Sequence, residues 1–98
     1  MESKINWSDE AKNILAKINA FNPKPGAWFT FGNERIKVFK AIEINSKGKP
    51  GEVLDKELTV ATGKSSIKIL ELQKEGKSIL SSQEFLKGTK ILKGDNLT

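Results

Sequence analysis

The sequence predicts a mainly β fold: a small β-barrel with an N-terminal helix before the strands and a short C-terminal helix after them. Five or six short segments rich in β-branched and aromatic residues are separated by turn residues, and this spacing is typical of a small barrel. A barrel also leaves no strand edge open to other chains. With 98 residues, the chain is long enough for one domain, residues 1–98, and too short for two.

The N-terminal helix is predicted from Ser8 to Ala20 by its apolar spacing. Ser8 is a favourable N-cap, and Asp9 and Glu10 follow it where the helix dipole stabilises negative charge. The segment from Asn22 to Gly26 contains two prolines and ends the helix, because proline lacks the N–H that a helix needs. The face expected to meet the core carries apolar residues at helical spacing: Ala11, Ile14, Leu15 and Ile18.

Two strands and a hairpin turn are predicted next. Ala27 to Phe31 is aromatic and rich in β-formers, and Gly32-Asn33 is a turn signal. The second strand, Arg35 to Ile44, alternates apolar and polar residues, but Phe39 breaks the alternation. We therefore expect a bend or β-bulge near Phe39 and Lys40, which would keep both halves of the strand in register with the core.

The second half of the chain predicts further short strands and one helix. Ile67 to Leu72 is apolar on both faces, which is typical of a central strand. Ser81 and Glu84 fit a capping box, so a short helix is expected from Ser82 to Lys87, ended by Gly88. One helix before the strands and one after them make the predicted barrel OB-like. The remaining predicted strands are Val53-Leu54, Leu58 to Thr62 and Ile91-Leu92.

The residue types that usually carry catalysis or hold metals are missing. The chain has no cysteine and no histidine, which removes disulfides, thiolate ligands and the commonest general base at neutral pH. Acidic residues occur in an ordinary turn around Asp55 and at the start of the first helix. No apolar run reaches the roughly 18 residues of a membrane span. We therefore predict no catalytic, cofactor-binding or metal-binding residue and no membrane contact. A chain without cysteine suits a reducing cytosol as well as any other compartment, and we expect a cytoplasmic location.

The charge of the chain suggests a polyanionic partner. It carries a net charge of +5, with 16 lysines and one arginine, Arg35. Lysine binds phosphate as a point charge, whereas reading of guanine bases favours arginine, so contact with a nucleic-acid backbone is expected to dominate. Lysine is also an ordinary surface residue, so composition alone leaves both interpretations open. Trp28 is a candidate stacking surface for bases, although most aromatic residues of so small a domain fill its core.

Seven segments resemble the C-terminal domain of the methionyl-tRNA formyltransferase family, and they follow in the same order over nearly the whole chain. At the position of Asn19 the family usually has arginine, and at Lys24 it often has tryptophan, so one potential RNA contact is missing and one is added. The matching segments are Ile5 to Ser8, Ala20 to Trp28, Ile36 to Val38, Pro50 to Leu54, Val60 to Gly63, Leu70 to Lys77 and Ser82 to Gly88.

The resemblance implies an accessory domain that is inactive on its own. The family transfers a formyl group from 10-formyltetrahydrofolate to the methionine of initiator tRNA, and its catalytic residues belong to an N-terminal domain that we expect to be absent from this chain. We expect the domain to bind no cofactor itself, to be monomeric, to contact the initiator tRNA backbone and to lie beside that N-terminal formyltransferase domain. Lys37 and Lys77 match lysines of the family motifs and are the first candidate RNA-binding residues. Lys24, Lys40 and Lys74 follow on charge and loop position.

A second interpretation remains open. In other folate-dependent formyltransferases a similar domain could act as a structural module that packs on its catalytic partner. An exposed apolar patch larger than a few hundred Å² favours packing. A continuous surface of lysines favours RNA binding, because each phosphate contact releases counterions.

Overall fold

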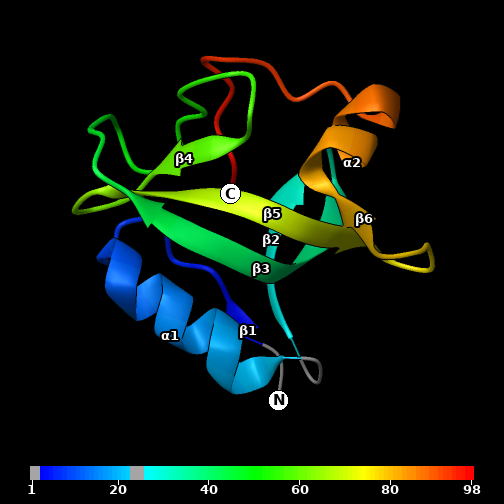
Figure 1. The fold of residues 1–98 in the computed structure, drawn as a ribbon, viewed down its shortest axis with the longest axis horizontal. Coiled ribbons are helices and arrows are strands. Elements are labelled where there is room, and N and C mark those ends of the chain that lie inside the picture. Colours follow the sequence, from blue (N-terminus) through cyan, green and yellow to red (C-terminus); the bar gives the residue numbers. More distant parts are fainter. Residues whose placement is uncertain (1–2, 23–25) are drawn as a thin grey trace.

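The computed structural model describes residues 3–22 and 26–98, and it is mainly β, as predicted. The chain forms one mixed sheet, with α1 between its first two strands in sequence and α2 after its last strand (Figure 1). The prediction that the first helix precedes all strands is wrong, because the short strand β1 comes before it. The elements are β1 (Ser3–Lys4), α1 (Ala11–Phe21), β2 (Ala27–Phe31), β3 (Glu34–Ile44), β4 (Thr59–Ala61), β5 (Ser66–Lys74), β6 (Leu80–Ser81) and α2 (Ser82–Gly88).

The sheet has the strand order β1-β2-β3-β5-β4, with β6 pairing to β5. β1 pairs with β2 in parallel, and the other pairs are antiparallel. The prediction that Ile67 to Leu72 is central is confirmed, because β5 lies between β3 and β4. The predicted β-bulge is also confirmed, since the β3–β5 register shifts on both sides of Lys40.

Strand pairing does not close this sheet, so the predicted OB-like barrel is not confirmed. Irregular segments span the distance between β4 and β2 through isolated bridges and loop hydrogen bonds. The N–H of Ala61 donates to the carbonyl of Glu52 at 2.9 Å, that of Leu97 to Gly51 at 2.8 Å, and that of Thr98 to Thr30 at 3.1 Å. Gly51, with φ +90°, turns the chain out of the extended conformation that a continuous strand needs.

Three predicted elements differ in detail. Val53-Leu54 contributes an isolated bridge to Val60 in place of a strand. Ile91-Leu92 is not a strand either, because the N–H of Leu92 donates to Asp95 Oδ2 at 2.8 Å and is used in a local turn. The first helix begins at Ala11, three residues later than expected, because Asp9 donates its N–H to the Asn6 carbonyl in a preceding turn.

The core lies between α1 and the irregular segments, and β5 contributes to it from both faces. Ile67, Ile69 and Leu72 of β5 are fully buried. The apolar face of α1 packs mainly on β3, and Trp7 meets Phe29 edge-to-face with ring centroids 5.9 Å apart. This packing leaves the end of β5, the following turn and α2 at the edge of the molecule, where Figure 1 shows α2 opposite α1.

Candidate nucleic-acid interface

Four of the five predicted RNA-binding lysines lie in or beside the second half of β5. Lys37 pairs with Gln73, and Lys40 pairs with Glu71 across the β3–β5 ladder. Lys74 is the last residue of β5, and Lys77 follows in the turn before β6. The fifth candidate, Lys24, lies outside the described residues. The structure therefore gathers four candidates around one stretch of seven residues, 71–77.

These lysines are divided between the two faces of the sheet. Lys74 pairs with the buried Ile36, whereas Lys37 is the next residue along β3. Because neighbouring residues of a strand point to opposite faces, Lys37 and Lys74 lie on opposite faces of the ladder. Glu71 and Gln73 are two residues apart on β5, so their partners Lys40 and Lys37 share one face.

Gln73 adjoins both Lys37, which is on β3, and Lys77, which is in the turn after β5. Gln73 is the ladder partner of Lys37, and its Nε2 donates to the carbonyl of Lys77 at 2.6 Å. The methylene groups of Lys37 lie close to Gly26, since a Cβ added at Gly26 would be 3.1 Å from Lys37 Cδ. Lys37 and Lys77 therefore occupy adjoining positions at this edge, although 40 residues separate them in sequence.

The lysines differ in whether an acidic group neutralises them. Lys74 Nζ lies 3.4 Å from Glu34 Oε1 and 5.8 Å from the centre of the Phe85 ring. Within residues 3–22 and 26–98, the side chains of Lys37, Lys40 and Lys77 form no salt bridge. Among the described residues, three ammonium groups at this edge therefore have no acidic partner, which is the state in which a phosphate group gains most from them.

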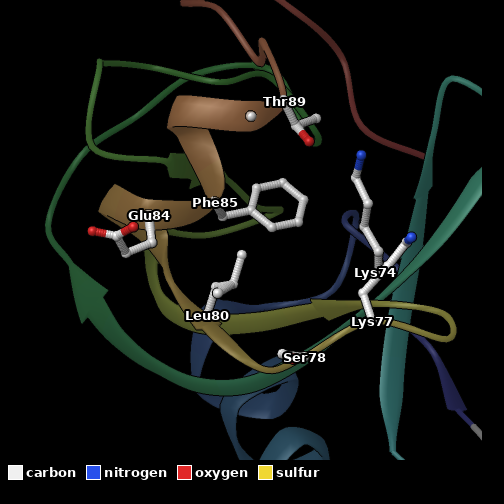
Figure 2. A pocket seen from close by; sticks show the side chains of 8 residues that line it. Lys74, Lys77, Ser78, Leu80, Glu84, Phe85 and Thr89 are labelled. Carbon is white, nitrogen blue, oxygen red and sulfur yellow. The ribbon is translucent and has the colours of Figure 1, made fainter.

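A pocket of about 250 Å³ lies between the end of β5 and α2. Figure 2 shows Phe85 in the middle of it, with Lys74 and Lys77 on one side and Glu84 on the other. Most of its lining is apolar. Phe85 is buried, whereas Leu80 keeps 38% of its surface exposed. The lining residues are Lys74, Lys77, Ser78, Leu80, Glu84, Phe85, Gly88 and Thr89.

The pocket depends on the short helix α2, which begins as the sequence predicts. Ser81 is the N-cap, and its Oγ accepts the N–H of Glu84 at 3.2 Å. The carboxylate of Glu84 bonds Lys87 Nζ at 3.2 Å, so it is the Ser81 half of the capping box that is present. Phe85 follows Glu84 in α2, and its ring points towards the side chain of Lys74, the last residue of β5 (Figure 2).

Trp28 is half-buried and is covered by cations. The guanidinium of Arg35 lies 4.0 Å from the ring centre, and Lys4 Nζ lies 5.5 Å from it. Its indole Nε1 is buried and has no hydrogen-bond partner in the described part of the chain. The ring is thus not an open stacking platform. Sequence reasoning missed this arrangement because the parallel pairing of Lys4 with Trp28 leaves no periodic signal.

The acidic residues have structural roles. Asp55 Oδ1 accepts the N–H groups of Glu57 at 2.8 Å and Thr59 at 3.1 Å. Partial burial raises the pKa of Asp55, but these hydrogen bonds and the charge of Lys68 outweigh it and leave the pKa lowered. Asp55 is therefore ionised at neutral pH and shapes the turn before β4.

No group of three metal-binding side chains is found in residues 3–22 and 26–98.

A second lysine group was not singled out from the sequence. Lys56, Lys90 and Lys93 line a pocket of about 250 Å³ together with apolar residues. Leu92, one of those apolar residues, is 61% exposed. A run of lysines three residues apart, at Lys87, Lys90 and Lys93, was the available signal, but Lys56 joins it only through the fold.

The chain belongs to the formyl transferase C-terminal domain family, whose model matches residues 1–90. Among curated relatives, it is 43% identical over 98 residues to the methionyl-tRNA formyltransferase of Pelagibacter ubique and 40% identical over 94 residues to that of Rickettsia prowazekii. The resemblance noted in the sequence is thereby confirmed. These matches cover 99% and 94% of the chain but 32% and 31% of the relatives, so the chain spans about a third of their length.

Solved structures show the same fold. HypX from Aquifex aeolicus, crystallised in complex with tetrahydrofolic acid, superposes with a TM-score of 0.72 at 28% identity over 97% of this chain. The match covers 20% of the HypX chain. Neither helix in the described part of the chain is long and apolar enough to cross a membrane.

Proposed function

We propose that this chain is the domain of a methionyl-tRNA formyltransferase that holds methionyl-tRNA by its phosphate backbone. The observation that carries the proposal is the group of four lysines on the two faces of the sheet around residues 71–77, three of which have no acidic partner in the described structure. The names of the relatives supply the polyanion, since they act on a tRNA-borne methionine.

The mechanism is electrostatic positioning. Lys37, Lys40 and Lys77 contact phosphates from the two sides of one sheet edge, and the partly neutralised Lys74 contributes less. Contacts of this kind set the position and orientation of a nucleic acid but carry no sequence information. Formyl transfer itself, with 10-formyltetrahydrofolate as donor, takes place in a separate N-terminal domain. The 98-residue chain itself supplies no catalytic residue and binds no folate.

A salt series tests the proposal directly. The affinity of the 98-residue chain for methionyl-tRNA is measured by fluorescence anisotropy between about 50 and 200 mM salt. Four phosphate contacts predict a slope of log affinity against log salt of about −3. Binding to other tRNAs should be similar, because phosphate contacts do not specify sequence. An affinity that does not change with salt is incompatible with this mechanism.

A packing role is the second candidate, and Leu92 is the observation that favours it. This residue is 61% exposed and adjoins Leu86 and Ile91 in the second pocket. A leucine so exposed gains free energy when a partner covers it. Amide hydrogen exchange of residues 86–93 distinguishes the roles. Packing predicts slower exchange in a protein that joins this chain to its formyltransferase domain than in the chain alone.

A further inference from the structure

The pocket between β5 and α2 has the size and chemistry of a site for one small, flat, largely apolar group. Its volume of about 250 Å³ is just below the roughly 300–1,000 Å³ of sites for drug-sized ligands. Leu80 offers an exposed apolar surface inside it, and the methylene stems of Lys74 and Lys77 form a wall beside Phe85 (Figure 2).

The charges around the pocket favour an anion beside the wall formed by Lys74 and Lys77, and not beside the opposite wall. Glu34 partly neutralises Lys74, whereas Lys77 forms no salt bridge with any residue that the structure describes. On the opposite wall the carboxylate of Glu84 is occupied by Lys87. A ligand that fits is therefore apolar where it meets Leu80 and negatively charged where it meets Lys77.

The pocket also offers polar atoms for the edge of such a group. Ser78 and Thr89 line it, and in the described structure neither side chain makes a hydrogen bond. Hydroxyl groups both donate and accept, so they can bond the mixed donor and acceptor edge of a nucleobase.

We propose that this pocket binds one unpaired nucleobase of the RNA, with the adjoining phosphate on Lys77. The proposal rests on the proposed function and adds to it a site for a base. A nucleotide combines an apolar ring with a neighbouring negative charge. The base must be unpaired, because a base that is stacked and paired inside an A-form helix cannot insert into a pocket, whereas an unpaired base can be splayed out. The backbone then continues past Gln73 to Lys37 on the other face.

Two RNA stems that differ in one nucleotide test this site. One carries a single bulged 2-aminopurine, and the other is fully paired. Contact with one base is worth about 1–3 kcal/mol, so we expect the chain to bind the bulged RNA about tenfold more tightly. Emission of the bulged 2-aminopurine should change on saturation, because the base leaves water for an apolar pocket.

Neighbouring residues provide matched variants. Leu80→Ala should remove the preference for the bulged RNA, whereas Ile79→Ala should keep it, since Ile79 is 52% exposed but does not line the pocket. Gly88→Leu should also remove the preference. Gly88 lines the pocket and a Cβ there meets no atom within 4 Å, so we expect the leucine side chain to fill part of the pocket. Circular dichroism checks that each variant is folded.

The outcomes separate this proposal from the proposed function. Equal affinity for both stems with unchanged 2-aminopurine emission overturns the base site, while salt-dependent binding to both leaves the phosphate contacts in place. A preference for the bulged RNA that survives both Leu80→Ala and Gly88→Leu also overturns it, because the base then binds elsewhere. Failure to bind either stem at low salt overturns both proposals.

Discussion

Lys37 and Lys77 both adjoin Gln73, which is the backbone ladder partner of Lys37 and donates its side-chain Nε2–H to the carbonyl of Lys77 at 2.6 Å. This hydrogen bond holds the turn after β5 in a fixed position relative to β3. The two lysines that best match the family motifs thus present their charges in a constant arrangement.

Replacing Gln73 tests whether this arrangement matters for RNA binding. Gln73→Leu removes one hydrogen bond and should lower the free energy of unfolding by about 1 kcal/mol. Affinity for tRNA should fall several-fold, since Lys77 then loses entropy when it contacts a phosphate. The control is Gln83→Leu, at an exposed glutamine that is in α2 and makes no side-chain hydrogen bond in the described structure. Unchanged affinity in Gln73→Leu argues against a role for this link.

The turn before β4 predicts an acid-dependent loss of stability. The folded-state pKa of Asp55 lies below its ordinary value of 3.8, so ionised Asp55 stabilises the fold above that value. This stabilisation is lost as pH falls through the lowered folded pKa. Asp55→Asn should cost roughly 1 kcal/mol at neutral pH, a modest value because solvent screens the partly exposed carboxylate. The difference from wild type should vanish at a pH below both pKa values. Urea unfolding at several pH values measures it, with the exposed Glu43→Gln as control.

Gly63 is required because the turn before β5 closely approaches the segment before α1. A Cβ at this position would overlap the carbonyl oxygen of Ser8, and the Gly63 N–H donates to the Asp9 carbonyl at 2.8 Å. Gly63→Ala should lower the free energy of unfolding by about 3 kcal/mol or more, because backbone must move. Gly88→Ala is the matched control, since its Cβ meets nothing, and thermal unfolding compares the two. Similar melting temperatures for both variants would refute this account of Gly63.

The cap of α2 has a smaller, local effect. Ser81→Ala removes the acceptor for the Glu84 N–H and should cost about 1 kcal/mol. Ser78→Ala, at a serine without a side-chain hydrogen bond in the described structure, is the control for stability alone and should leave the free energy of unfolding unchanged. Because α2 forms one wall of the pocket, Ser81→Ala should also weaken binding of the bulged RNA more than binding of the paired stem. Denaturant unfolding and the two-stem comparison measure these effects.

Local signals account for the elements that were predicted correctly. The break in alternation at Phe39 located the bulge, and Ser81 with Glu84 located the start of α2. The errors come from interactions distant in sequence. β1 consists of two residues that pair in parallel with β2, and no local sequence pattern predicts so short a strand or its pairing. Ile91 is buried like a strand residue, yet local hydrogen bonds determine the backbone there.

The candidate site was predictable only in part, because local signals identify its residues but not how they come together. Charge and motif position singled out Lys37 and Lys77, but their proximity depends on the β3–β5 register. The pocket could not be predicted, because Leu80 and Phe85 reach it from β6 and α2 only after these pack against β5. The division of the lysines between two faces follows from the alternation along β3 and from the bulge at Lys40.

The most direct test of the central claim compares two double charge reversals with the same net charge. One changes Lys37 and Lys77 to glutamate, and the other changes Lys12 and Lys49, which lie in α1 and in the loop after β3, away from the end of β5. The salt dependence of tRNA binding is measured for both. The first pair should reduce the log–log slope by about 2 and weaken binding strongly, whereas the second should change the slope little. Equal losses for the two pairs would show that only net charge matters and would contradict an interface at the end of β5.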